Sequence, residues 1–331
     1  LYWQVFGTPM WIFFMKIKSL SVENFRAINK LELRDLGEMV VVAGANGCGK
    51  TQIYHAIRLI KSTYGGYQKN EFQQWWGEFN IRLDVPSKEL QRIFRDPRKP
   101  IILNATFELL DSEKAFLSRN AEQIVRQQLW MEVNPKGRMD SLGGGGPAVA
   151  HLQRQHGERI NKQAEKDAKS VREAISSNLL DAAIVVNPTL EFSITHNAAL
   201  ELLFSTYDSE HLGVIQYHGA QRSYDREQLG GINLNIKQSD DKSKQHALYN
   251  WQGKYSNIKS ELAAGYVRQL ISAQAKEPVE ESASLTETLQ ELFTTFFPGK
   301  YFPGIVAGSD GTLDFPVALE AGGEHDIDDL S

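Results

Sequence analysis

Cysteine is nearly missing from this chain of 331 residues, which contains Cys48 and no other cysteine. One cysteine cannot form an intramolecular disulfide, and this scarcity favours a reducing, cytoplasmic location. A large excess of charge of one sign is also missing. The chain has 36 lysines and arginines against 41 aspartates and glutamates, which gives a formal charge of -5. Nothing in this balance favours nucleic acid as a partner of the whole chain, so any DNA contact requires a local patch.

Long apolar runs are missing as well. The first fourteen residues, LYWQVFGTPMWIFF, are uncharged, but they are too short to span a bilayer and have no basic leader. We therefore expect no membrane partner. The simpler interpretation of residues 1–14 is an extension upstream of a native start at Met15, and the alternative is a real N-terminal arm.

A glycine-rich loop follows three predicted strands. Alternating residues over 15–27, the run Leu31–Leu33 and the apolar run Met39–Gly44 each predict a strand. Apolar residues then recur at helical spacing and predict a helix with one buried face: Ile53, Ala56, Ile57 and Ile60. The local pattern is strand, loop, helix.

The loop GANGCGKT, Gly44 to Thr51, matches G-x-x-x-x-G-K-[ST] at every fixed position. In this setting backbone N–H groups and the positive helix end converge on an anion, Lys50 reaches the β- and γ-phosphates, and the Thr51 hydroxyl binds magnesium. The sequence therefore predicts ATP and Mg²⁺ as ligands, with Lys50 as catalytic residue and Thr51 as metal ligand. The predicted contacts are Gly44, Ala45, Asn46, Gly47, Cys48, Gly49, Lys50, Thr51 and Gln52. The alternative is a glycine turn with an incidental lysine.

The segment KIKSLSVENFRAINKLEL, followed by VVVAGANGCGKT, resembles the N-terminal lobe of ABC-type ATPases of the SMC, RecF, RecN and OLD kind. In those proteins a short strand ends in an Asn-Phe-Arg turn, which here is Asn24, Phe25 and Arg26. The resemblance implies an α/β P-loop NTPase fold with a helical insertion and a helical subdomain. It also implies that Arg26 is a second phosphate contact; the alternative is a solvated turn arginine.

The end of the chain carries a separate resemblance. A predicted hairpin and the string DDLS look like the approach to the signature sequence of this family, with Leu330 and Ser331 as its first residues. The Asp-Glu pair that the family uses to hold magnesium and activate water is not found. The nearest string, FELLDSE at Phe107–Glu113, is predicted to be a strand followed by a helix cap. We therefore expect ATP binding with poor turnover.

The pattern divides the chain into six predicted segments. These are an extension over 1–14, an ATPase lobe over 15–140, a Gly-rich linker and helical arm over 141–180, a return to the lobe over 181–235, a helical subdomain over 236–298 and the start of a second lobe over 299–331.

Within these segments further elements are expected. Residues 64–79 are predicted to be an irregular surface segment, and 141–150 a mobile linker. Strands are predicted over 101–110, 190–195 and 213–217, and a hairpin over 305–319. Helices are predicted over 112–130, about 151–180 with an apolar stripe from Ile160 to Leu179, 243–271, and from a cap at Ser284 to Phe296.

Three other clusters are weaker candidates. The string HGAQRSYDRE at 218–227 is suited to nucleotide sensing or to an inter-subunit ion-pair cluster. RIFRDPRK at 92–99 is the best local basic patch for a phosphate backbone, although a solvated face is the simpler interpretation. His325, Asp326, Asp328 and Asp329 suggest an acidic surface turn rather than a metal site.

The first functional hypothesis is a nucleotide-dependent switch in which two copies sandwich ATP head to head and control an effector protein such as a nuclease. Compact relatives fit best: RecF-type repair proteins, OLD-type nucleases and the ATPase subunits of anti-phage systems such as Septu and PARIS. One alternative is a scaffold or inhibitor that uses ATP as a structural ligand and docks a partner through the helical arm over 150–180 and the aromatic segment around Trp75. The other is a repair ATPase that binds DNA through Arg92 and Arg95.

Overall fold

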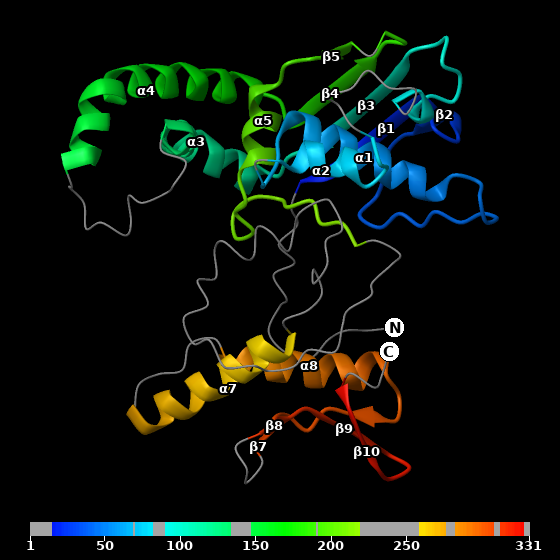
Figure 1. The fold of residues 1–331 in the computed structure, drawn as a ribbon, viewed down its shortest axis with the longest axis vertical. Helices are drawn as coiled ribbons and strands as arrows, with labels where there is room; N and C mark the ends of the chain where they lie inside the picture. Colours follow the sequence, from blue (N-terminus) through cyan, green and yellow to red (C-terminus); the bar gives the residue numbers. More distant parts are fainter. Residues whose placement is uncertain are drawn as a thin grey trace. The chain divides into compact units, whose positions relative to one another are not determined.

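The computed structural model describes residues 15–68, 70–81, 90–133, 147–189, 191–218, 258–275, 282–307 and 312–327. Contacts within the chain divide these residues into a first unit that ends at Tyr217 and a second unit that holds the described residues from His218 onward (Figure 1). Each unit has a hydrophobic core of its own. The six segment boundaries expected from the sequence remain a prediction.

A five-stranded sheet forms the centre of the first unit (Figure 1). Its strands are β1 (Lys16–Phe25), β2 (Ile28–Leu33), β3 (Ile101–Glu108), β4 (Leu179–Val186) and β5 (Phe192–Ile194). They lie in the order β2-β1-β3-β4-β5, and every neighbouring pair is antiparallel. The strands expected over 15–27, 31–33, 101–110 and 190–195 are confirmed, whereas β4 was not predicted.

One face of this sheet is buried, because side chains alternate along each strand. Leu103 of β3 lies opposite Val22 of β1 and Ile184 of β4, and all three are fully buried. Helix α1 (Lys50–Tyr64) covers this face through Ala56 and Ile60. Each buried leucine or isoleucine contributes about 1.5–3 kcal/mol. The helix predicted after Thr51 is therefore confirmed, and its packing fixes the position of the loop that precedes it.

The expectation of an irregular surface segment over 64–79 is wrong. Helix α2 (Glu71–Gly77) forms there, and Trp75 and Trp76 are completely buried. Their rings meet edge to face, with centroids 4.7 Å apart, and Trp76 also packs against Phe192 of β5. Aromatic side chains of this size contribute more by burial than the two preceding glycines cost, so the segment becomes part of the core.

Three helices complete the first unit: α3 (Asp111–Val133), α4 (Pro147–Ala174) and α5 (Ala198–Ser205). Helix α3 was predicted, and so was the apolar stripe of α4, which packs against α3 and α5. Of the predicted linker, residues 141–146 lie outside the described residues, and Pro147–Ala150 form the first turn of α4 instead. Proline suits a first helical position because its missing N–H would have no intrahelical partner there. A short 3₁₀ helix, η1, spans Leu90–Ile93.

Two predicted strands are absent from the described part of the chain. The run Met39–Gly44 has no strand hydrogen bonds, and Met39 and Val41 are 85% and 82% exposed. A strand exists only beside a neighbour, and no described strand pairs with this run. Residues Gly213–Tyr217 are also not a strand, because N–H groups there bond to side chains instead.

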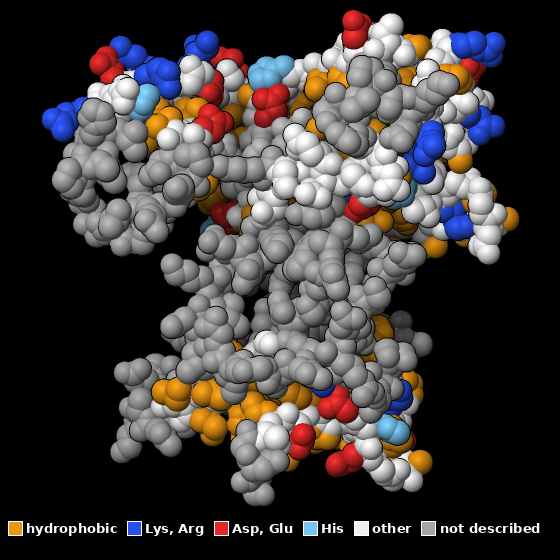
Figure 2. Space-filling view, in the orientation of Figure 1, with side chains coloured by type: hydrophobic (Ala, Val, Ile, Leu, Met, Phe, Trp, Pro, Cys, Tyr) orange, Lys and Arg blue, Asp and Glu red, His pale blue; other side chains and the backbone are white. Residues whose placement is uncertain are grey.

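The second unit packs two helices against short strands. Helices α7 (Ile258–Ala275) and α8 (Ser282–Phe296) contribute Leu262 and Phe293 to a core with Phe302, Phe315 and Val317. The strands are β6 (Lys300–Tyr301), β7 (Val306–Ala307), β8 (Leu313–Asp314), β9 (Pro316–Leu319) and β10 (Glu324–Asp326). Figure 2 shows apolar side chains on the surface of α7 and α8, where Leu270, Ile271, Leu292 and Phe296 are exposed.

The pairing of β7 with β8 confirms the predicted hairpin, whose turn residues 309–311 lie outside the described residues. Helix α8 ends before Pro298-Gly299, as predicted, and Gly299 has a φ of 80° that favours glycine. Ser284 is not a cap, because α8 already begins at Ser282. The predicted helix over 243–271 is confirmed only from Ile258, because residues 243–257 lie outside the described residues.

Candidate nucleotide-binding site

The loop from Gly44 to Gly49 enters α1 through backbone conformations that favour glycine. Gly47 and Gly49 have φ angles of 79° and 97°, and Gly49 is the N-cap of α1. A Cβ atom on Gly44 would lie 2.9 Å from Cys48 Sγ, which is closer than van der Waals contact allows. The positive φ angles at Gly47 and Gly49 therefore favour glycine for the shape of the loop, and a side chain at position 44 would displace the Cys48 thiol.

Lys50 folds back over this loop. Its Nζ donates hydrogen bonds to the carbonyl oxygens of Gly44 at 2.7 Å and Ala45 at 2.8 Å, and it lies 3.9 Å from Cys48 Sγ. The loop closes on itself through a bond from Cys48 N–H to Ala45 O at 3.3 Å. An ammonium group thus lies directly above the loop, where a phosphate would be attracted.

The start of α1 fits an anion and a divalent cation. The first turn contains no acidic residue, so the positive helix end is not neutralised there. Thr51 is exposed at this end, where its hydroxyl is accessible to a metal ion. Gln52 Oε1 is buried and has no hydrogen-bond partner among the described residues. The residues present fit a nucleoside triphosphate with magnesium. Asn46, Gly47 and Cys48 are exposed, so the loop is open to such a ligand.

The Asn-Phe-Arg turn lies beside the loop. A Cβ atom on Gly49 would be 3.5 Å from Ala27 Cβ, so the turn between β1 and β2 touches the start of α1. Arg26 has a φ of 51°, and its guanidinium carbon lies 4.3 Å above the centre of the Phe79 ring. Burial lowers the pKa of Arg26 from its ordinary value, which the guanidinium tolerates without losing its charge. The structure thus places this predicted residue on an aromatic platform next to the loop.

Phe79 was not singled out from the sequence. It packs edge to face against His55 of α1, with ring centroids 5.0 Å apart, and against Trp75 at the same distance. Its contact with Arg26 joins residues far apart along the chain. No local pattern could have predicted that contact.

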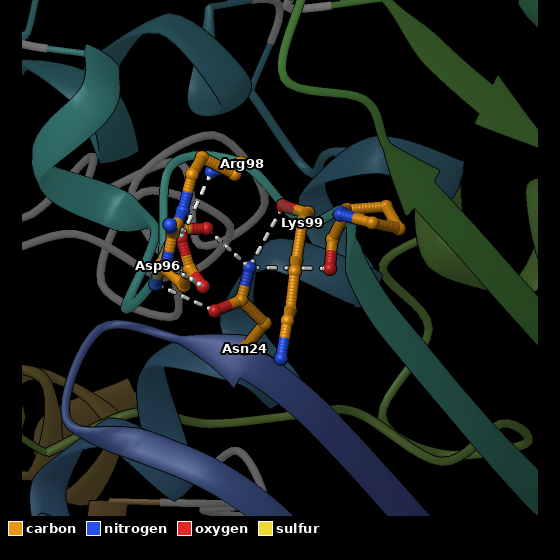
Figure 3. Close-up of polar contacts among 5 residues, drawn as sticks. Asn24, Asp96, Arg98 and Lys99 are labelled. Atoms are coloured by element: carbon orange, nitrogen blue, oxygen red, sulfur yellow. Dashed lines mark hydrogen bonds and ion pairs between the residues drawn. The ribbon is translucent and has the colours of Figure 1, made fainter.

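Asn24 fixes the other side of the turn (Figure 3). Its side chain is buried and donates to the carbonyl oxygens of Asp96 at 2.9 Å and Lys99 at 2.8 Å, while its Oδ1 accepts from Asp96 N–H at 2.7 Å. Asn24 adopts a φ of 57°, a left-handed conformation that asparagine tolerates better than most residues. The loop that contains the predicted basic patch is therefore held rigidly.

The basic patch itself is exposed. Arg92, Arg95, Arg98 and Lys99 all face solvent, and Asp96 pairs with Arg98 at 3.0 Å (Figure 3). A cavity of about 460 Å³ lies between this loop and the β1–β2 turn. The Arg98 guanidinium lowers the pKa of Asp96 to about 2, so this carboxylate stays charged and reduces the positive potential of the patch.

The other predicted clusters are only partly described. Of the string 218–227 only His218 lies within the described residues, and residues 328–331 lie outside them, Leu330 and Ser331 included. His325 and Asp326 lie on β10, where Asp326 accepts from Lys259 at 2.7 Å. Phe107–Glu113 is a strand end followed by a helix start, as predicted. Within the described ranges no group of three His, Cys, Asp or Glu side chains is placed to hold a metal ion.

Comparison with known proteins places this site in a family. Residues 15–294, which are more than half of the chain, match the family described as AAA ATPase domain. The chain belongs to this AAA ATPase domain family. It is a P-loop ATPase of the ABC and AAA type, of the SMC, RecF and RecN kind, so the resemblance seen in the sequence is confirmed. Membership in the AAA ATPase family implies ATP binding and, in general, ATPase activity.

One curated relative is similar over a shorter stretch. An uncharacterized protein of Methanocaldococcus jannaschii, MJECL10, is 26% identical over 121 residues, which are 31% of this chain and 51% of the relative. The chain spans about half the length of that relative. The name of that relative indicates no substrate. Among the helices of this AAA ATPase that the structure describes, none has the length and apolar character needed to cross a membrane.

Proposed function

We propose that this chain binds Mg-ATP at Gly44–Thr51 and acts as a nucleotide-dependent switch that controls an effector protein, such as a nuclease in phage defence or DNA maintenance. The observation that carries the proposal is the loop itself. Lys50 Nζ lies over the carbonyls of Gly44 and Ala45, at the positive end of a helix whose first turn has no acid. A triphosphate offers this ammonium stronger, charged acceptors than two neutral carbonyls.

The proposed contacts follow the order of the loop. Backbone N–H groups of the loop would bind the phosphates, the Lys50 ammonium would pair with the β- and γ-phosphates, and the Thr51 hydroxyl would bind magnesium. Arg26, stacked on Phe79, supplies a second charge from the neighbouring turn. When bound, ATP supplies a γ-phosphate whose presence or loss distinguishes two states of the protein. Two copies would sandwich the nucleotide head to head, as the family resemblance implies, in the cytoplasm.

Binding of a fluorescent ATP analogue to the whole chain tests this proposal. We expect Lys50→Ala to weaken binding by about ten- to a hundredfold, because a hydrogen bond to a charged group contributes about 1.5–3 kcal/mol. Thr51→Ala should remove most of the difference between binding with Mg²⁺ and binding with EDTA. Lys162→Ala, a lysine of α4 whose side chain is 75% exposed, is the matched control and should bind normally.

Two results would contradict the proposal. If the unmodified chain does not bind the analogue, the loop is a structural turn. If Lys50→Ala binds as tightly as Lys162→Ala does, the ammonium has no role in holding phosphate. We also expect slow turnover from the 331-residue chain, and fast hydrolysis that depends on Lys50 would refute that part.

DNA contact is a second candidate function, supported by the exposed arginines at 92, 95 and 98 and by the Asn24 amide that holds their loop. The scaffold alternative loses the docking surface expected around Trp75, because that side chain is completely buried.

A further inference from the structure

The guanidinium of Arg26 is half-buried, and no hydrogen-bond acceptor contacts it among the described residues. Its recorded side-chain contact is the Phe79 ring, whose centre lies 4.3 Å from the guanidinium carbon. The backbone of Arg26 is bonded separately, because its N–H donates to Ile93 O at 2.6 Å. An arginine side chain carries five N–H donors and keeps its charge when it is partly buried. Such a cation can bind an anion that the described chain does not supply.

The turn that carries Arg26 lies against the phosphate loop and its helix. A Cβ atom on Gly49 would be 3.5 Å from Ala27 Cβ. Burial lowers the pKa of His55 to about 4, and the charges of Arg58 and Arg26 make smaller contributions. Because His55 belongs to the second turn of α1, the Arg26 charge must lie near the start of this helix. The unused donors are therefore close to the proposed phosphate site.

The Phe79 ring is itself fixed from two sides. It meets the rings of Trp75 and His55 edge to face, and both pairs of ring centroids are 5.0 Å apart. Its backbone N–H donates to Trp76 O at 3.0 Å, and both tryptophans are completely buried. The ring is thus attached to the core, and it can hold a mobile side chain in place.

An aromatic face holds a cation differently from a carboxylate. A carboxylate would accept from the N–H donors and neutralise the charge, whereas the face of a ring attracts the cation without accepting those hydrogen bonds. A side chain that is already ordered also loses less conformational entropy when a ligand binds. The stack on Phe79 therefore leaves Arg26 ordered, charged and able to donate.

We propose that Phe79 is a positioning residue for nucleotide binding, and that its ring holds the Arg26 guanidinium beside the loop, where its donors bind the phosphates of ATP. The inference rests on the proposed binding of ATP at Gly44–Thr51. Phe79 touches no phosphate in this arrangement and acts through Arg26. Its contribution to affinity should therefore vanish when Arg26 is removed.

A double-variant cycle on ATP affinity tests this assignment in the whole chain. Arg26→Gln removes the charge and should weaken binding of a fluorescent ATP analogue by about tenfold or more. Phe79→Leu keeps an apolar side chain without an aromatic face and should weaken binding by about three- to tenfold. In the Arg26→Gln background, Phe79→Leu should change affinity by less than about twofold, because the ring acts through the arginine.

Two further variants separate positioning from packing. Phe79→Tyr keeps the aromatic face and should bind the analogue within about twofold of the unmodified chain. Phe116→Leu is the matched control, because this half-buried ring of α3 also packs against a histidine, His211, with centroids 4.4 Å apart. It should bind the analogue normally. Should Phe79→Leu fail to fold, Phe79→Met supplies a longer and more adaptable apolar side chain for the same cycle.

The outcomes separate this inference from the proposed function. If Arg26→Gln binds normally while Lys50→Ala binds weakly, the inference is wrong and the binding site stands. If Phe79→Leu costs the same affinity with and without Arg26, or if Phe79→Tyr binds as weakly as Phe79→Leu does, the ring acts through packing and the assignment is refuted. If the unmodified chain does not bind the analogue at all, both proposals fail.

Discussion

The buried ion pair between Lys61 and Glu71 gives a sharp test of the first unit. Lys61 Nζ lies 2.9 Å from Glu71 Oε2, and both side chains are 0% exposed. Lys61→Met removes the ammonium and leaves a buried carboxylate, a change that destabilises proteins by about 3–5 kcal/mol. We expect a value near the lower end, about 3 kcal/mol, because Tyr67 N–H still donates to Glu71 Oε2 at 2.7 Å.

The double variant Lys61→Met, Glu71→Leu should be much closer to the unmodified protein, within about 2 kcal/mol. Replacing both members of a buried pair with apolar side chains removes the uncompensated charge together with its partner. The difference between the double variant and the sum of the single variants measures the coupling of the pair.

Urea unfolding followed by tryptophan fluorescence is the assay. Trp75 and Trp76 are completely buried on α2, the helix that also carries Glu71, so their emission reports on this unit. Lys162→Met is the control, because the pair between Lys162 and Glu158 is exposed and should contribute less than about 1 kcal/mol. If Lys61→Met shifts the midpoint no more than this control does, the pair is not buried as described and the reasoning is refuted.

Two further predictions concern the neighbourhood of the loop. Burial lowers the pKa of His55 to about 4 in the folded chain, against 6.5 in the unfolded chain. Between these pH values the unfolded chain therefore binds more protons than the folded chain does. The free energy of unfolding should fall by about 2–3 kcal/mol as the pH drops from 6.5 to 4. His55→Asn should flatten this slope in urea titrations at several pH values, and an unchanged slope would assign it elsewhere. Asn24→Ala should destabilise the first unit by about 2–4 kcal/mol, because it removes the buried amide from the Asp96 loop and places alanine at a φ of 57°. Thermal unfolding checks this, and Asn24→Gly separates backbone strain from the lost amide.

The loop and its helix could be predicted from the sequence because their signals are local. Glycines, a lysine and a hydroxyl at fixed spacing specify the turn, and the apolar residues of α1 have clear helical spacing. The platform beneath Arg26 could not be predicted in this way. Phe79 lies far along the chain from Arg26, and only the packing of α2 brings the two together.

The wrong predictions of secondary structure have a common physical cause. In each case the residue that determines the structure by packing or pairing lies far away in the sequence. Gly65 and Gly66 predicted a loop around Trp75, yet burial against Phe192 of β5 makes that segment part of the core. Leu179 continued the helical spacing of α4, but pairing with Glu108 of β3 makes it the first residue of β4. The local hydrophobic pattern of a segment contains no information about either of these distant contacts.

The exposed run from Met39 to Val41 would make protein concentration a variable in studies of the loop if it pairs with a second copy of the chain. A row of amides that have no strand partner among the described residues, with exposed apolar side chains, is a template for another extended chain, a second copy included. Such pairing would fix the backbone only a few residues before Gly44, where the loop begins. Self-association and nucleotide affinity are then thermodynamically linked, and each should rise with the other. With such pairing, a dissociation constant for ATP would have a defined meaning only at a stated concentration of the protein.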